Sequence, residues 1–445
     1  MKKSRLNRRN FLRNTSLGFL GAGLLGNDGL ASPIQDQENE LPQIREYRTL
    51  GRTGFKVSDI GCGTILNESV LKALLKSGVN YIDTSEIYGG GNNEKMIGKC
   101  LKDFNRKNIF LTTKVWSRPA FTTTEDVLGR VRKSLERLQT DYIDCLMIHE
   151  ATNSEIVKNE YFHSAMDQLK TEGKVKYVGI SCHGHNWRED IPTESMEQIL
   201  GTAIDDGRFD AFLLVYNVIN QSEGNRILSL CKKKNIGTTI MKSNPLAKLD
   251  LINVYREQFK KDSMPFPEWA TDVENKFTIY GDHLKNYIKD NKLKSEDELL
   301  RDITIPFVLE NSKVSTVLYS FLNFNDIESV IPLSGKKLTA QGKTILDQYV
   351  QNYGILNCHI GCNICESKCP HNVPVNTILR YNYYFANKRQ EKYAMQKYQE
   401  LPGGKPDLCL NCEGYCEQAC PYGVLTRPLL AIANHNLSID SPLYS

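Results

Sequence analysis

The sequence predicts an α/β protein, a (β/α)8 TIM barrel followed by a smaller C-terminal domain. Two observations carry this prediction. Between about residues 45 and 335, eight short apolar runs alternate with segments of helical periodicity, which is the pattern of a parallel barrel. Beyond that region, eight of the 13 cysteines of the 445-residue chain gather in one stretch. We therefore divide the chain into a barrel at 45–345 and a cysteine-rich domain at 346–445.

The first 44 residues differ in composition from the rest. Adjacent arginines, Arg8 and Arg9, stand in "LNRRNFLR" and are followed by a glycine-rich apolar run at 17–26. That run is shorter than the roughly 20 apolar residues that span a bilayer, and a basic front before it is typical of a signal peptide. We expect a twin-arginine signal at 1–31 and a polar linker at 32–44. An untargeted basic N-terminus is the alternative, because Asn7 stands where such signals usually carry Ser or Thr.

The charge of the chain is concentrated in this leader. Residues 1–31 hold six basic residues and one acid, so without them the formal net charge of +4 becomes about −1. A near-neutral protein without a basic patch does not indicate nucleic-acid binding. No later segment is long and apolar enough to cross a bilayer. We expect a periplasmic or otherwise exported protein that uses the twin-arginine translocase and has no membrane span when mature.

The predicted strands follow one another at the spacing of a parallel barrel. In chain order they read DIGCGT, VNYID, IFLTTKV, YIDCLMIH, KYVGIS, AFLLVYN, GTTIM and STVLY. Between the third and fourth runs, residues 124–138 have apolar side chains on one helical face, which predicts a helix. A long excursion at about 247–296 follows the seventh run. It is either a lid or substrate wall at the active-site face or a decorative insertion.

Four polar residues stand at or just beyond the ends of successive predicted strands. Asp83 and Tyr88 follow the second strand, Lys114 ends the third, and His149 ends the fourth. These strand ends form the catalytic face of such barrels. A nearby ammonium lowers the pKa of a tyrosine from about 10, a carboxylate holds the ammonium, and a histidine can orient a substrate oxygen. An Asp or Lys alone at a strand end is usually part of a structural ion pair, but the four residues together predict acid–base catalysis.

The C-terminal cysteines form two groups that each end in Cys-Pro, CHIGCNICESKCP and CLNCEGYCEQACP. Such short spacings bring several thiolates to one iron–sulfur cluster, and in two-cluster ferredoxins the Cys-Pro cysteine ligates the other cluster. We expect a ferredoxin-like domain with two [4Fe–4S] clusters. The first would be held by Cys358, Cys362, Cys365 and Cys420, and the second by Cys409, Cys412, Cys416 and Cys369. Disulfides and two zinc sites of four thiolates each are the alternatives.

Further expectations concern the segment between the two cysteine groups, the other cysteines, and the export of a protein that holds clusters. The segment between the cysteine groups is aromatic and helix-like, and we expect its aromatic side chains to pack rather than to contact a cofactor. The five other cysteines are expected to be inert small hydrophobes. Iron–sulfur clusters are built in the cytoplasm and would be lost from an unfolded chain. A cluster protein therefore needs an export route for folded proteins, which agrees with the arginine pair.

Over roughly residues 45–335 the chain resembles the aldo/keto reductases. "REYRTLGRTGFKVSDIGCGT" is similar to that family's N-terminal hairpin and first strand, and "DTSEIYG", "TTKV", "DYIDCLMIH" and "KYVGIS" match its signatures in order. The resemblance implies an NAD- or NADP-dependent oxidoreductase for a small carbonyl or alcohol substrate. It implies Tyr88 as proton donor, Lys114 and Asp83 as its tuning pair, and His149 as carbonyl orienter. The implied cofactor contacts are Thr64, Ser181, Met241, Lys242, Ser320 and Asn323.

Several positions depart from the family pattern. Cys182 replaces an asparagine, Leu213 a glutamine, and Met241 the tyrosine that stacks on the nicotinamide. The following "HGH" offers two histidines, His183 and His185, which are more typical of a polar loop than of a ligand site. Asp326, after the last strand, would repel the 2′-phosphate of NADP and so favours NAD. The nicotinamide pocket is therefore altered although the four catalytic candidates are intact.

The whole chain resembles a subgroup with a twin-arginine signal and a C-terminal ferredoxin-like domain. We interpret it as an exported oxidoreductase for an alcohol or carbonyl group, with a sugar-like compound as a candidate substrate. Two alternatives stay open: an epimerase or lyase that retains its nicotinamide, and an electron-transfer module with a vestigial barrel. The intact catalytic set argues against the second. A redox partner is expected if the clusters carry electrons.

Overall fold

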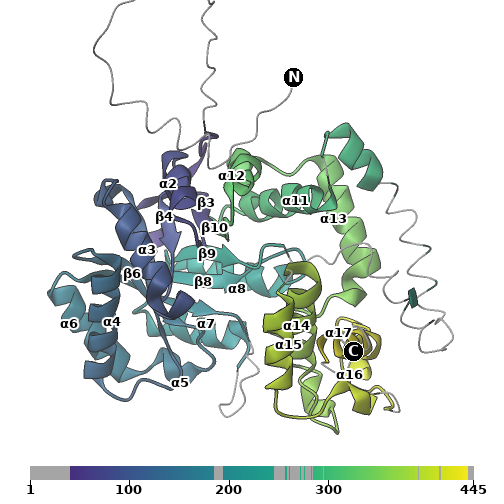
Figure 1. Ribbon diagram of the computed structural model, residues 1–445. Helices are drawn as coiled ribbons and strands as arrows, with labels where there is room; N and C mark the ends of the chain where they lie inside the picture. Colours follow the sequence, from purple (N-terminus) through teal and green to yellow (C-terminus); the bar gives the residue numbers. More distant parts are fainter. Residues whose placement is uncertain are drawn as a thin grey trace, which may run out of the picture.

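The computed structural model describes residues 41–184, 194–244, 284–293, 295–388, 390–409 and 412–438, with scattered positions between 256 and 282. The predicted signal peptide, most of the linker and most of the excursion after the seventh strand lie outside the described residues. Within them, eight parallel strands close into a barrel with helices around it (Figure 1). The predicted (β/α)8 barrel is therefore confirmed.

The barrel strands run in chain order, and β10 pairs with β3 to close the sheet. Each of the eight apolar runs read from the sequence contains one strand. Their bounds are β3 (Ile60–Cys62), β4 (Tyr81–Asp83), β5 (Phe110–Trp116), β6 (Ile143–His149), β7 (Val175–Cys182), β8 (Ala211–Val215), β9 (Gly237–Met241) and β10 (Thr316–Tyr319).

Helices connect the strands on the outside of the barrel. The helix expected at 124–138 is α4, and the Thr123 side chain caps its first turn by accepting a hydrogen bond from the backbone N–H of Asp126. The others are α2 (Glu68–Lys76), α3 (Asn92–Leu101), α5 (Ser154–Val157), α6 (Glu160–Thr171), α7 (Met196–Asp206), α8 (Gln221–Lys233), α11 (Glu296–Glu310) and α12 (Phe324–Val330).

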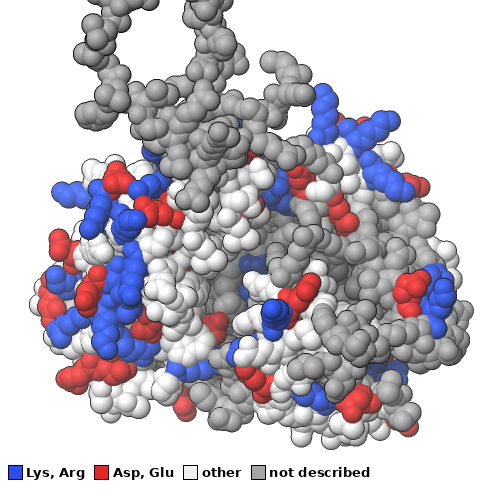
Figure 2. Space-filling view, viewed as in Figure 1, with Lys and Arg blue, Asp and Glu red and all other residues white. Residues whose placement is uncertain are grey.

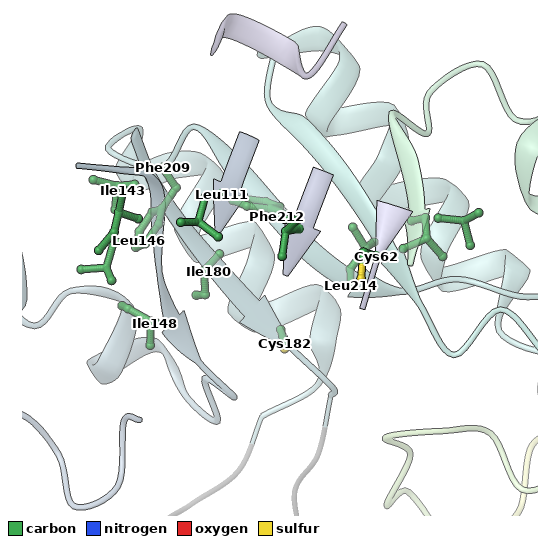
Figure 3. Packing of buried hydrophobic residues seen from close by; sticks show 14 of the residues in the cluster. Cys62, Leu111, Ile143, Leu146, Ile148, Ile180, Cys182, Phe209, Phe212 and Leu214 are labelled. Atoms are coloured by element: carbon green, nitrogen blue, oxygen red, sulfur yellow. The ribbon is translucent and has the colours of Figure 1, made fainter. Parts of the chain in front are cut away.

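Alternate residues of the strands pack in two apolar layers, as side chains of a pleated strand must. The layer between strands and helices includes Leu146, Ile148, Phe212 and Leu214 (Figure 3). The layer inside the barrel includes Tyr81, Phe110, Cys145, Met147, Ala211 and Leu213.

A hairpin of β1 (Tyr47–Thr49) and β2 (Lys56–Ser58) covers the amino-terminal end of the barrel. Phe55 in its turn lies 5.3 Å, between ring centroids, from Phe110 of the interior layer. Because the hairpin covers this end, the opposite end, where the strands finish, is the one left for a site.

The chain continues through α13 (Ala340–Tyr353) into a helical domain of α14 (Val375–Lys388), α15 (Glu391–Gln399), α16 (Tyr415–Gln418) and α17 (Thr426–Leu437). Helix α14 packs against α15 and α17. In Figure 1 these yellow-green helices lie beside α8 and β8 of the barrel. In the part of the chain that the structure describes, no helix has the length and apolar character to cross a membrane.

Candidate active site

The four predicted catalytic residues meet at the carboxyl ends of β4, β5 and β6. Lys114 Nζ donates hydrogen bonds to Asp83 Oδ2 at 2.5 Å and to the Thr84 carbonyl at 2.6 Å. The same ammonium lies 5.0 Å from the centroid of the Tyr88 ring. Asp83, Lys114 and His149 are buried, whereas Tyr88 is only half-buried. The phenol is therefore the member of the set that faces the opening.

Burial decides the protonation state of this group. The pKa of Tyr88 is raised, first by burial and then by the charges of Asp83 and Glu150, and these effects outweigh the lowering by Lys114. The expectation that the lysine leaves Tyr88 with a lowered pKa is therefore wrong in its net direction. Burial would lower the pKa of Lys114, but Asp83 and Tyr88 raise it above its usual value. At neutral pH the pair is thus a phenol beside an ammonium.

His149 is held as a neutral imidazole. Burial, followed by the charges of Lys114 and Arg118, puts its pKa well below the usual value. Its Nδ1 lies 2.9 Å from Ser85 Oγ, and its ring meets those of Tyr88 and Trp116 edge to face. With Nδ1 engaged by Ser85, Nε2 is the ring nitrogen that can face a substrate oxygen.

The predicted cofactor residues lie around the same mouth, at the ends of the first, fifth, seventh and eighth barrel strands. Thr64 follows β3, and Ser181 lies on β7, where its hydroxyl accepts the backbone N–H of Glu150 at 2.9 Å. Met241 ends β9, and Ser320 follows β10. The side chains of Thr64, Met241 and Ser320 are at least partly exposed, whereas Ser181 is buried.

Two predicted cofactor residues have other partners. Lys242 Nζ donates to Tyr384 Oη of the cysteine-rich domain at 3.0 Å. Asn323 caps α12 by accepting the backbone N–H of Asp326 at 3.2 Å. In return the Asp326 carboxylate accepts the N–H groups of Leu322 at 2.7 Å and Asn323 at 3.1 Å. Asn323 and Asp326 therefore form a capping box at the start of α12.

Sequence reasoning missed three residues at the mouth: Glu150, Arg380 and Tyr384. Glu150 directly follows His149 and has a left-handed backbone, with φ of 54°. Arg380 and Tyr384 come from α14, in the segment whose aromatic side chains were expected only to pack. Tyr381 packs in the core of this domain and Tyr384 packs against that core, while the Tyr384 hydroxyl also reaches Lys242 of the barrel.

The histidine loop after β7 joins this group through His183. Its Nε2 lies 3.7 Å from Glu150 Oε1, and its Nδ1 lies 3.5 Å from an Nη of Arg380. Burial first, then the charges of Lys242 and Arg380, put the pKa of His183 well below its usual value. It is therefore a neutral polar bridge. His185 lies outside the described residues.

All eight C-terminal cysteines are described, and most of the electrostatic effects between thiols fall within the two predicted sets, with Cys416 acting on Cys365 across them. Burial first, and then Cys362 and Cys365, raises the pKa of Cys358, and Cys420 adds to the raised pKa of Cys362. In the second set, burial raises the pKa of Cys409 to about 12, with contributions from Cys416, Cys369 and Cys412. Among the described residues, no group of three or more Cys, His, Asp or Glu is arranged to hold a metal ion.

The two cysteine groups repeat one local structure 51 residues apart. In the first half, the backbone N–H groups of Val373 and Asn376 donate to Cys369 Sγ at 3.4 Å and to Glu366 Oε1 at 2.8 Å. In the second half, the equivalent donors contact Cys420 Sγ at 3.4 Å and Glu417 Oε1 at 3.0 Å. A helix follows each unit, α14 in one and α17 in the other. The five remaining cysteines are buried in the barrel, as expected.

Residues 66–350 match the sequence model of the aldo/keto reductase family, which is more than half of the chain. The chain belongs to the aldo/keto reductase family. L-galactose dehydrogenase of Arabidopsis thaliana is 28% identical to it over 306 residues, which cover 64% of this chain and 86% of that protein. The solved aldo-keto reductase AKR11C1 from Bacillus halodurans is 20% identical, with a TM-score of 0.48 over 68% of this chain and 95% of that one. The chain is thus an aldo/keto reductase-type oxidoreductase, and its cysteine groups lie beyond the matched region.

Proposed function

We propose that this chain is an exported oxidoreductase that interconverts an alcohol and a carbonyl group on a small, sugar-like substrate with a nicotinamide cofactor. The observation that carries the proposal is the buried Lys114–Asp83 pair beside a half-buried, protonated Tyr88 and a neutral His149. The similarity to a plant L-galactose dehydrogenase supports a sugar-like substrate.

The mouth of the barrel fits a nicotinamide dinucleotide that lacks a 2′-phosphate. Ser181 and Met241 would lie against the nicotinamide end, with Thr64 and Ser320 beside them. Just before α12, the Asp326 carboxylate accepts the backbone N–H groups of Leu322 and Asn323, and it would repel an added phosphate. This supports NAD over NADP. When bound, the nicotinamide supplies or accepts the hydride.

The chain's own residues handle the proton. In the reducing direction, His149 orients the substrate carbonyl through Nε2, and Tyr88 donates its proton to the carbonyl oxygen. The Lys114 ammonium stabilises the phenolate that remains, and Asp83 balances the charge of the lysine. In the oxidising direction the phenolate of Tyr88 takes the hydroxyl proton back. General acid–base catalysis of this kind is worth about 10²–10⁴-fold in rate.

We also propose that the cysteine-rich domain is ferredoxin-like and holds two [4Fe–4S] clusters in the crosswise sets given above. The repeated Cys-Pro units and the grouping of the thiols support this. The N–H groups that donate to the sulfur atoms of Cys369, Cys420 and Cys358 also support this proposal, because such contacts stabilise cluster thiolates. A four-iron cluster binds each thiolate to a different iron, so it does not need the tight single-ion arrangement of a zinc site. The clusters serve either a redox partner or the stability of the domain.

The test of the oxidoreductase is a turnover screen. The purified full chain is given NAD⁺ with a panel of aldohexoses that includes L-galactose, and nicotinamide reduction is followed. For a compound that is turned over, Tyr88→Phe is expected to lower the rate by about 10²–10⁴-fold without unfolding the protein. Tyr161→Phe, an exposed tyrosine on α6, is the control and should behave as wild type. A Tyr88→Phe variant with the wild-type rate would remove Tyr88 from the mechanism.

A further inference from the structure

Helix α14 of the cysteine-rich domain places Tyr384 against Lys242, at the mouth of the barrel. Tyr384 and Arg380 lie one helical turn apart, and Arg380 Nε donates to Tyr384 Oη at 3.1 Å. Lys242, directly after β9, donates to the same oxygen at 3.0 Å. The phenol oxygen is thus the acceptor for two cationic donors, which is the arrangement that stabilises a phenolate.

This tyrosine and the catalytic tyrosine surround the same opening. Arg380 contacts His183, which contacts Glu150, and Glu150 is the residue next to His149. The charge of Glu150 acts both on Tyr88 and on Lys242. Tyr384 is half-buried, and Figure 2 shows this face of the molecule hollowed near its centre, where the barrel and the helices of the cysteine-rich domain meet. The contacts of Arg380, His183 and Glu150 thus connect Tyr384 to the catalytic group.

The cationic groups around Tyr384 lower the pKa of its phenol. Burial alone would raise its pKa, but the charges of Arg380 and Lys242 and the hydrogen bonds from both lower it to about 7. The other facing groups are the neutral His183, the carboxylate of Glu150, and the rings of Tyr383 and Tyr393. A base with a pKa near the working pH is the most effective kind for proton transfer.

Two backbone conformations hold this arrangement. Glu150 and Lys242, which follow β6 and β9, both have left-handed backbones, with φ of 54° and 58°. This backbone conformation is unfavourable for residues other than glycine. Such strain is typical of positions kept for function, and here it falls on the two residues that connect the Tyr88 side of the opening to the Tyr384 side.

We propose that Tyr384 is a second proton-transferring residue of the active site, contributed by the cysteine-rich domain and held by Lys242 and Arg380. The proposal rests on the proposed function, in which hydride transfer needs only Tyr88 as its acid–base group. Once the substrate alcohol has become a carbonyl, the neighbouring C–H bond is acidic. The Tyr384 phenolate takes that proton, the C–H bond breaks, and its electron pair stays on the substrate as an enolate. Return of the proton to the carbon restores the carbonyl compound with no net oxidation.

The first test needs no substrate. Tyrosinate absorption of the full chain is titrated by pH-difference spectroscopy in wild type, Tyr384→Phe and Tyr383→Phe. Tyr383 is the matched control, because it is the adjacent residue on α14, donates to the Asn244 carbonyl at 3.0 Å, and has a pKa raised by burial. One tyrosine should ionise near pH 7 in wild type and in Tyr383→Phe, and none in Tyr384→Phe. The absence of this transition from wild type, or its survival in Tyr384→Phe, would overturn the proposal.

The second test uses the compound that the turnover screen identifies, incubated in D₂O with the same variants and Tyr88→Phe. Wild type and Tyr383→Phe should incorporate deuterium at the carbon next to the oxidised one, and Tyr384→Phe should do so at least about 10²-fold more slowly. Equal incorporation by Tyr384→Phe and wild type would overturn the role of Tyr384 and leave the proposed function intact. A fully active Tyr88→Phe would instead count against the proposed function.

Discussion

At the residue scale, burial keeps two groups of the site neutral, whereas pairing keeps a third one charged. Tyr88 and His149 are both kept neutral by burial, whereas Lys114 keeps its proton because Asp83 lies against it. The site thus has one buried ion pair and two neutral hydrogen-bonding groups. Two measurements of stability test this assignment of charged and neutral groups.

Replacing Lys114 by Met would leave the Asp83 carboxylate buried without its partner. Removing one member of a buried ion pair typically costs about 3–5 kcal/mol, so we expect the free energy of unfolding of the barrel to fall by about that amount. The double variant Lys114→Met, Asp83→Asn should recover part of the loss because it buries no charge. Denaturant unfolding measures both variants, and an unchanged midpoint for the single variant would contradict a buried pair.

The neutral histidines predict how stability depends on pH. His149 and His183 have pKa values well below 6.5 in the folded protein and about 6.5 when unfolded. The unfolded chain therefore binds more protons as the pH falls, so stability is fully present above pH 6.5 and declines below it. We expect His149→Asn to show a shallower decline than wild type between about pH 6.5 and 5. Parallel stability curves for the two proteins would contradict this assignment.

At the element scale, the barrel was readable from sequence because each strand is an apolar run with its own boundary signals. Helix α4 even begins and ends at the predicted residues. The sequence did not predict which face of α14 contacts the barrel. Tyr381 and Tyr384 belong to the same aromatic segment, and no local pattern indicates which of them contacts Lys242, 142 residues away in the chain. Burial effects on Tyr88 were missed for the same reason, since they depend on packing that only the tertiary structure supplies.

The contact between the two domains depends on a close backbone approach. Gly361 has φ of 77°, and a Cβ there would come within 2.2 Å of the His183 carbonyl oxygen. Beside it, Ile360 exchanges hydrogen bonds with the Asn220 side chain. Gly361→Ala should therefore displace α14 from the barrel mouth and abolish the ionisation of Tyr384 near pH 7.

Hydrogen exchange of α14 and the tyrosinate titration check this prediction. Gly354→Ala is the control, because an added methyl group there meets nothing within 4 Å. Wild-type exchange and an unaltered titration in Gly361→Ala would show that the domain does not depend on this approach.

At the scale of the whole molecule, the proposed export signal and the proposed clusters support each other, because the clusters require a folded protein and the twin-arginine route carries folded proteins. Changing Arg8 and Arg9 to Lys should trap a folded, cofactor-loaded precursor in the cytoplasm, because the translocase reads the arginine pair. Fractionation of cells that express the two forms measures this, with Lys2→Arg, Lys3→Arg as the control that alters basic residues outside the pair. Undiminished export of the lysine variant would contradict the targeting argument.

The most direct measurement is the cofactor content of the exported protein, purified without oxygen and without added nucleotide. We predict about eight irons and eight acid-labile sulfides per chain, as two [4Fe–4S] clusters require, together with NAD released on denaturation. Cys420→Ala should lose one cluster and keep about four irons. Stoichiometric zinc without sulfide, or a protein that releases no nucleotide and works only with added NADPH, would contradict the account.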